Sequence, residues 1–373
     1  MAKRKPDLLK ALEAQRDWNA KLRTELRLAR RGFDAAKSDR LTAGWRLTGG
    51  GPNADVKAAL PLLRRRHQDL VDNNPWAARA ISVIVNNWVG ARGILGQPQG
   101  GRSSRRARLW TDWSESLACD FYGQQNLAGL QQQWARVTAT RGAVLIRKRI
   151  EPALARDGLP GLQLQTYEPD HLDASKRGPG IIGGVQFEAT GRVAGYWLKQ
   201  AHPLDSSALQ VGGDASEYVP REDMIHLFEV RRPGQYDGVP WGVSAMLRLR
   251  DLDDYDSAKL LKAKISACFV AFVTDATGEP DDSALDIDTL EPGAIETLPP
   301  GKTVELASPP QDREFEPFVR HQLHAVAAAY GLSYEALTGI LDQVNYSSGR
   351  MGWLEFNRNV AVWRWGIMIP RGL

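Results

Sequence analysis

Apolar residues recur at helical spacing through the amino-terminal part of the chain. In residues 7–31, the Leu and Trp positions cover about a third of a helix circumference, with Arg and Lys elsewhere, which predicts an amphipathic helix. Its polar face carries both charge signs, so a solvated helix against a neighbour is favoured over a membrane-surface helix. After a glycine-rich break at 48–52, a second helical stretch extends to Asp72. Asn74 and Pro75 then indicate a helix stop followed by a new start.

The helix that follows, residues 76–89, is apolar over most of its circumference and is therefore expected to be buried. Gly90 and Gly93 end this helix, and another is predicted over 102–117. From 143 to 228 the pattern changes to short β-type runs between Gly, Pro and Asp turns. These runs predict strands at 144–146, 162–165, 184–187, 196–198 and 224–228.

Helical patterning returns towards the carboxy terminus. A long helix is predicted at 244–265, followed by a Pro- and Asp-rich stretch at 275–311 and by helices at 315–330 and 350–368. The succession predicts an α+β fold with four divisions. These are a basic amphipathic segment at 1–40, a helical part at 41–142, a β-rich part at 143–243, and the long helix, Pro-rich insertion and final helices at 244–373.

Composition bounds the class of protein. The 373 residues are 43% hydrophobic and 25% charged, so the chain can bury a core of two or three structural units. No apolar run approaches the roughly 20 residues of a membrane span, and no secretory signal is predicted. The two cysteines, Cys119 and Cys268, are too far apart to indicate a disulfide framework or a zinc site, which predicts folding in a reducing cytoplasm.

The basic excess is confined to one end of the chain. Residues 1–40 hold twelve Lys or Arg against six Asp or Glu, so a total net charge of +4 leaves −2 for the other residues. A protein that reads DNA sequence concentrates Arg and Lys on its folded domain. The near-neutral body therefore does not favour that class.

Three features resemble ligand sites. Residues 301–303 read Gly-Lys-Thr, but Glu296 stands where a phosphate loop needs glycine and Pro299-Pro300 removes N–H donors, so a turn is predicted. His321 and His324 lie one turn apart, with only Glu314 and Glu316 nearby, so a metal site is not favoured. His226, within an apolar strand, is predicted to be a core or interface residue.

An acidic cluster lies within the long helix. Asp251, Asp253, Asp254 and Asp256 could bind a divalent ion, but Lys259, Lys262 and Lys264 follow within two turns. Acid before base along a helix suits its dipole and side-chain pairing, so a charged helix is favoured over a catalytic centre. No Gly-x-Ser-x-Gly elbow is present, and nothing in the sequence supports an enzyme.

Tryptophan is unusually frequent, with twelve residues against nine each of Phe and Tyr. Large amphipathic rings are favoured in cores and in subunit interfaces. Base stacking would need interleaved basic residues, which are sparse. The tryptophans are therefore predicted to be core and interface anchors.

A series of short sequence motifs, in a fixed order, resembles the lambda-type phage portal protein family. They include Leu-Thr-Ala-Gly-Trp at 41–45, Asp-Asn-Asn-Pro-Trp at 72–76, Ile-His-Leu-Phe at 225–228 and Tyr-Gly-Leu-Ser-Tyr at 330–334. The remainder of the series stands at 33–36, 77–80, 86–90, 93–94, 231–235, 238–241, 298–301, 335–339 and 345–348. Each motif alone is weak evidence for the resemblance, but the ordered set spans about residues 33–365.

The resemblance implies a portal fold, with a helical and β-rich wing and clip, stem-type helices and a helical crown, assembled as a dodecameric homo-oligomeric ring. Such a ring sits at one vertex of the capsid in the virion, and in the host cytoplasm during assembly. It passes double-stranded DNA without sequence preference during packaging and ejection. It docks the terminase large subunit, capsid or scaffold protein, and head-completion and tail proteins. It has no catalytic site, cofactor or membrane partner. The family pattern continues beyond Leu373, so the crown is expected to be missing.

The resemblance also suggests which residues face DNA. The helix at 244–265 is the candidate stem helix, and the loop at 341–345 is the candidate DNA-facing loop. The candidate channel residues are Lys259, Lys262, Lys264, Asp342, Gln343, Asn345 and Arg350. A nearly neutral body suits passage of DNA, since each neutralised phosphate adds binding energy. Two alternatives stay open: a capsid or head–tail adaptor protein without a channel, and a metal-dependent nuclease using Asp251–Asp256.

Overall fold

The computed structural model describes residues 13, 15–19, 50–96, 104–156, 158–205, 215–267, 271–275, 302–306, 315–342 and 345–372. The chain divides into two compact units, Met1–Gly51 and Pro52–Leu373. In the first unit the described residues from 13 to 19 are helical with an exposed Trp18, and the rest of the helix predicted at 7–31 lies outside the described residues. None of the described helices is long and apolar enough to cross a membrane.

The second unit begins with four helices, of which the first three were predicted and the last was not. These are α2 (Pro52–Asn73), α3 (Pro75–Trp88), α4 (Arg105–Glu115) and α5 (Leu127–Arg141). Asn74 separates the first two because its side-chain oxygen accepts hydrogen bonds from the N–H groups of Trp76 and Ala77, both at 3.0 Å. Pro75 follows at the first helical position, where its missing N–H costs nothing. The predicted stop and start at this point are confirmed.

Two antiparallel sheets follow. One has the order β2–β1–β7 and the other the order β3–β4–β5–β6. Their strands are β1 (Ala143–Ile150), β2 (Leu162–Tyr167), β3 (Ile181–Ile182), β4 (Val185–Phe187), β5 (Val193–Lys199), β6 (Ser216–Pro220) and β7 (Met224–Phe228). The five predicted strands are confirmed. The two residues of β3, and β6 with its Ser, Glu and Pro, carry too weak a pattern to be predicted. Short helical segments lie between the strands: α6 (Pro152–Arg156) and 3₁₀ turns at 169–171 and 221–223; a further 3₁₀ turn at 117–119 lies between α4 and α5.

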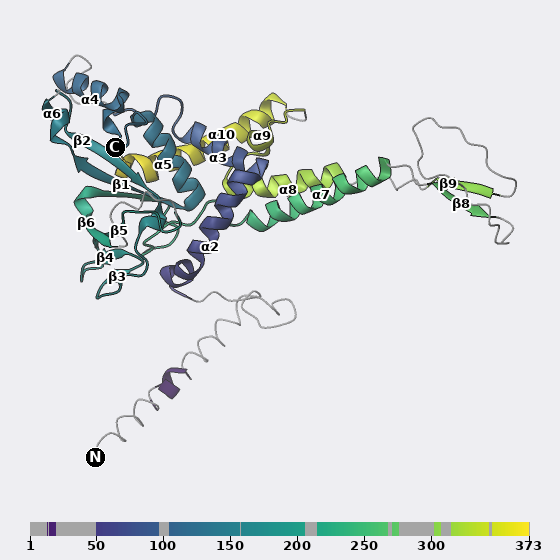
Figure 1. Ribbon diagram of the computed structural model, residues 1–373, viewed down its shortest axis with the longest axis horizontal. Helices are drawn as coiled ribbons and strands as arrows, with labels where there is room; N and C mark the ends of the chain where they lie inside the picture. Colours follow the sequence, from purple (N-terminus) through teal and green to yellow (C-terminus); the bar gives the residue numbers. More distant parts are fainter. Residues whose placement is uncertain are drawn as a thin grey trace. The chain divides into compact units, whose positions relative to one another are not determined.

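Alternation along β1 explains why both faces of the first sheet are covered. Val144 and Ile146 enter a core shared with the helices, whereas Leu145 packs with residues of the second sheet. Successive side chains of a strand point to opposite faces, so one apolar run supplies both cores. Figure 1 shows α5 along the sheet that contains β1 and β2.

The carboxy-terminal part is mainly helical. It contains α7 (Met246–Ala267), α8 (Phe315–Tyr330), α9 (Tyr334–Thr338), α10 (Tyr346–Trp363), a π-helical turn at 364–368 and α11 (Ile369–Gly372). The predicted helices are confirmed. In the Pro- and Asp-rich stretch, however, Lys302–Leu306 forms β9, which pairs with β8 (Ala271–Asp275). The expected turn at Lys302 and Thr303 is wrong: both residues belong to a strand in which Thr303 and Glu305 alternate with Val304 and Leu306, opposite a segment with β-branched Val273 and Thr274.

Tryptophans join the first and last parts of this unit. Trp88 stacks on Trp241 with ring centroids 5.1 Å apart, and Trp241 lies 4.9 Å from Trp363. All three side chains are buried, as are Trp113 and Trp134. The predicted role as core anchors is confirmed for these five. Helices from both ends of the second unit therefore share one core.

A buried histidine also ties α2 to α8. His67 Nδ1 donates to the carbonyl oxygen of Thr140 (2.7 Å), and Nε2 accepts from the Tyr330 hydroxyl (2.8 Å). Both ring nitrogens are thus hydrogen-bonded within the core. A Cβ at Gly242 would collide with the Tyr330 hydroxyl and the His67 ring, so the close approach of this turn requires glycine.

Acidification should weaken the fold through His67. Burial lowers the pKa of His67, against an opposing effect of its hydrogen bond to Thr140. The unfolded chain therefore takes up a proton first, so this stability is complete above about pH 6.5 and is lost as pH falls below it, by at most about 1.4 kcal/mol per pH unit. Urea unfolding between about pH 5 and 7.5 measures this slope.

The matched comparison is His67→Gln against His171→Gln. The pKa of His171 is also lowered, chiefly by burial, so each histidine adds its own part of the slope. His67→Gln should reduce the slope of the free energy of unfolding against pH by the contribution of His67. His171→Gln should leave that contribution unchanged. Equal slopes in wild type and His67→Gln would contradict the assignment.

Candidate functional site

The candidate channel lysines lie on α7, which is paired with α8. The two helices run side by side and antiparallel (Figure 1). Arg248 Nη1 donates to Gln322 Oε1 (2.7 Å), and the Tyr255 ring stacks on Phe315. Lys259 lies over both aromatic rings, 5.3 Å from the centroid of Tyr255 and 6.0 Å from that of Phe315. Lys259 thus takes part in the packing between the helices.

The other two lysines, Lys262 and Lys264, are exposed near the end of α7. At 100° per residue, Lys262 lies about 60° around the helix from Lys259, whereas Lys264 lies about 160° from Lys262. The helix therefore brings Lys259 and Lys262 towards one side and Lys264 to another. A basic last turn suits the helix dipole without any ligand.

The second group of candidates lies between α9 and α10. His324 of α8 stacks on Tyr334 at 4.2 Å, which anchors α9, and Gly339 ends α9 with a φ of 76°. The side chains that follow, Asp342, Asn345 and Arg350, are exposed, and Gln343 lies outside the described residues. The structure thus places the candidates in two groups, one on α7 and one at the start of α10.

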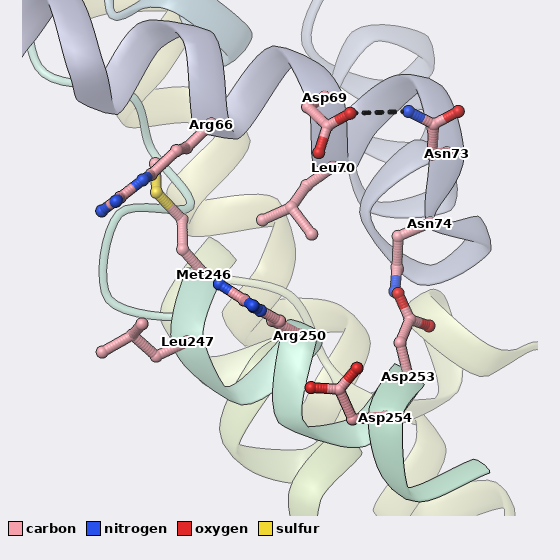
Figure 2. Close-up of a pocket in the computed structure, with 10 residues that line it drawn as sticks. All are labelled: Arg66, Asp69, Leu70, Asn73, Asn74, Met246, Leu247, Arg250, Asp253 and Asp254. Carbon is pink, nitrogen blue, oxygen red and sulfur yellow. Dashed lines mark hydrogen bonds between the residues drawn. The ribbon is translucent and has the colours of Figure 1, made fainter. Parts of the chain in front are cut away.

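A pocket of about 360 Å³ lies between α2 and α7. Leu70 and Met246 contribute apolar surface, and polar side chains come from both helices (Figure 2). These polar residues are Arg66, Asp69, Asn73, Asn74, Arg250, Asp253 and Asp254. Three carboxylates against two guanidinium groups do not favour a phosphate backbone. The mixed charge over apolar surface is typical of a protein interface.

A second charged cluster joins the two sheets. Arg141 Nη2 donates to Glu168 Oε2 (2.6 Å), and Arg141 Nη1 lies 3.8 Å from Asp170 Oδ2. His202 Nε2 lies 3.4 Å from Glu168 Oε2, and His202 Nδ1 accepts from the Leu204 N–H. Glu168, Asp170 and His202 are the one metal-type trio found among the described residues. Because Arg141 already compensates the carboxylates and the ring proton falls on Nε2, the cluster fits an ion-pair network better than a metal centre.

The acidic cluster of α7 does not form such a trio. Asp251, Asp253 and Asp254 are exposed, and Asp256 is half-buried. Burial, with a smaller effect from Asp253, raises the pKa of Asp256. Within the described part of the chain these carboxylates do not converge with a third ligand-type side chain. Among the described residues, these carboxylates therefore do not form a three-ligand metal centre of the kind that would support the nuclease hypothesis.

The sequence interpretation missed two exposed apolar faces. On α10, Met351, Leu354 and Val362 point away from the core, and on α7 so do Leu247 and Leu261. The signal was present, because residues 350–368 are apolar at positions that cover two sides of a helix. Periodicity shows that a helix has an apolar face, but an all-round apolar helix needs a second partner.

Comparisons with known proteins cover most of the chain. A family model described as "Phage portal protein, lambda family" matches residues 38–364. Similar curated proteins are the probable portal protein of Halomonas phage phiHAP-1, 25% identical, and portal protein B of Escherichia phage lambda, 24% identical. Each match covers 86% of this chain and 66% or 70% of the relative, so the chain spans about two thirds of their length.

Solved structures share the fold. A chain of the virion of a native gene transfer agent particle matches with a TM-score of 0.51 and 14% identity, over 87% of this chain and 79% of the other. A chain from the neck of an empty particle of this kind, with C6 symmetry, matches with a TM-score of 0.50 and 15% identity, over 87% and 84%. The α+β fold expected from the resemblance is confirmed. With most of its length matched by the family model, the chain belongs to the lambda family of phage portal proteins.

Proposed function

We propose that copies of this chain form a ring at one vertex of a phage capsid, through which double-stranded DNA passes during packaging and ejection. The observation that carries the proposal is the family match over residues 38–364. That range contains the second unit from α2 to α10, so the match extends over both sheets, the α7–α8 pair and the loop before α10.

The charge distribution supports passage of DNA rather than capture. The chain beyond residue 40 has a net charge of −2, so a ring built from it does not pair strongly with phosphates. In this proposal α7 and the loop at 341–345 line the channel, with Asp342, Asn345 and Arg350 exposed to DNA. Because Lys262 and Lys264 lie about 160° apart around α7, at most one of these two lysines faces the DNA. DNA can slide through the channel only if each contact between the channel wall and the DNA is weak.

The partners follow from this role. The ring docks the terminase large subunit during packaging, then head-completion and tail proteins, and it contacts capsid or scaffold protein at its vertex. The ring acts in the virion, after assembly in the host cytoplasm. It performs no chemistry, because the energy for packaging comes from the terminase.

Electron microscopy and native mass spectrometry of the purified chain test the proposal. We expect closed annular particles with a central hole wide enough for duplex DNA, and a mass that is an integral multiple of the 41.3 kDa chain. A protein that stays monomeric at high concentration would contradict the portal role and favour an adaptor. A refined map in which neither α7 nor the 341–345 loop lines the hole would refute the channel assignment alone.

Nuclease activity is tested separately. The purified chain and an Asp253→Asn variant are incubated with linear duplex DNA and magnesium. No cleavage above the buffer control is expected from either protein. Cleavage that the substitution abolishes would overturn the non-enzymatic assignment.

A further inference from the structure

Helix α10 carries apolar side chains on two opposite sides. Phe356, Val360 and Trp363 are buried in the core. On the other side, four large apolar side chains are 51% to 74% exposed: Met351, Leu354 and Val362 on α10, and Trp365 in the π-helical turn that continues it. They stand at positions 0, +3, +11 and +14, so they line one outer face of the helix over four turns. Such a face in water indicates a partner.

The middle of this outer face is positively charged. Arg358, at position +7, is exposed and makes no ion pair or hydrogen bond with another residue in the described part of the chain. The α10 face therefore consists of apolar ends around one cation. Its partner should present apolar ends around an anion.

Helix α7 presents that pattern on its own outer face. Leu247 and Leu261, at positions 0 and +14, are 72% and 59% exposed, and Ala258 is exposed at +11. Asp254 stands at +7, exposed and without an ion-pair partner among the described residues. Leu247, Arg250 and Asp254 come from successive turns of α7 beside the pocket described above (Figure 2).

The two faces match in length and spacing, and their central charges are opposite. If the helices run parallel, each apolar position of α10 but Leu354 meets an apolar position of α7. Exposed Glu355 of α10 then lies beside Arg250, which occupies +3 on α7. The high exposure of both faces means that they do not cover each other within one chain. A second copy of the chain supplies the missing face.

We infer that the outer face of α10 in one subunit packs on the outer face of α7 in the next, with Arg358 against Asp254. The contact uses different surfaces of the two subunits, which is the arrangement that generates a closed ring. The inference rests on the proposed ring and names the surfaces that would close it. Burying the opposite charges together fixes the register of the two helices and disfavours misaligned contacts.

Charge reversal tests this contact. Arg358→Asp and Asp254→Arg each place like charges at the interface and should lower the affinity of each contact by about tenfold or more. Because the loss recurs at every contact of a ring, each variant alone should lose the annular particles in microscopy and native mass spectrometry. Both side chains are exposed, so circular dichroism and the melting temperature of the monomer should match wild type.

Mixing the two variants is the decisive arm. In the mixture, the α10 face of the Arg358→Asp chain meets the α7 face of the Asp254→Arg chain with opposite charges, and the reciprocal contact keeps the wild-type pair. Rings should reappear with the two chains alternating in equal numbers, and the double variant should form rings alone.

Failure of the inference is distinguishable from failure of the proposed function. If wild type never forms rings, the portal role fails. If wild type and both single variants all form rings, the ring stands and this interface is wrong. Loss of rings in the single variants without recovery in the mixture would overturn the pairing of Arg358 with Asp254.

Discussion

Replacing Asp237 with alanine should lower the free energy of unfolding by about 3–5 kcal/mol, since this leaves Arg64 buried without its counter-charge. Arg64 Nη2 donates to Asp237 Oδ2 (2.8 Å), and both side chains are buried. Arg64 Nε also donates to the carbonyl oxygen of Arg141 (2.9 Å), so the guanidinium joins α2 to the end of α5. Guanidinium-induced unfolding followed by circular dichroism measures the loss.

A matched control separates the buried pair from a general effect of removing a carboxylate. Asp223 is exposed immediately before β7, and Asp223→Ala should change stability by no more than about 0.5 kcal/mol. Replacing both members of the pair by apolar residues, Arg64→Met with Asp237→Leu, should recover much of the loss, because no charge is then buried unpaired. Equal stabilities of Asp237→Ala and Asp223→Ala would contradict this account.

The same pair predicts a response to acid. Burial acts to raise the pKa of Asp237, but Arg64 and His226 hold it below its ordinary value. For a carboxyl with a depressed folded-state pKa, the stabilisation is complete above the unfolded pKa of about 3.9 and is lost as pH falls below it. This window lies well below that of His67, so a pH series on wild type should show two separate declines.

Periodicity was sufficient for most elements of the second unit and insufficient for two kinds of feature. The buried helix α3 and the strands β1 and β7 follow from apolar runs because local burial decides them. The Arg64–Asp237 pair joins residues 173 positions apart, and nothing local indicates that Arg64, within an Arg triplet, turns inward. The pairing of β8 with β9 was not predicted for the same reason, because the two strands are separated in sequence by Pro- and Asp-rich residues.

The candidate site shows a similar division. The sequence indicated a mixed-charge α7 and a loop before α10; the structure has that helix, and the described loop residues 341, 342 and 345 are exposed. Lys259, however, packs over Tyr255, four residues before it on α7, and over Phe315 of α8, and no spacing rule predicts the second contact. The apolar outer face of α10 had a signal in the sequence, but its match with α7 could not be inferred, since periodicity does not show which surface covers an apolar face.

The second large effect on stability is expected from a buried tryptophan. Composition alone does not show which tryptophan rings are buried and which are exposed. Trp88→Ala should cost about 3–5 kcal/mol. The Trp88 ring is fully buried and contacts Trp241 and Trp363, with ring centroids 5.1 and 6.2 Å away. Its removal leaves a cavity where α3 meets the carboxy-terminal helices, where Arg364 also donates to the carbonyl oxygens of Asn87 and Trp88. Denaturant unfolding monitored by far-UV circular dichroism measures the cost.

Trp365→Ala is the matched control, because Trp365 is only two residues from the buried Trp363 but is 71% exposed. Its removal deletes an equal ring from a surface that is wet in the single chain, so the free energy of unfolding of the monomer should change by less than about 0.5 kcal/mol. If α10 packs on α7 of the next copy, the same substitution should still weaken ring assembly. Trp88→Ala should instead destabilise the monomer directly, and any loss of ring assembly should follow from that loss of stability. A Trp365→Ala chain that loses as much monomer stability as Trp88→Ala would place Trp365 in the core, and the outer face of α10 would then not be available to a second copy.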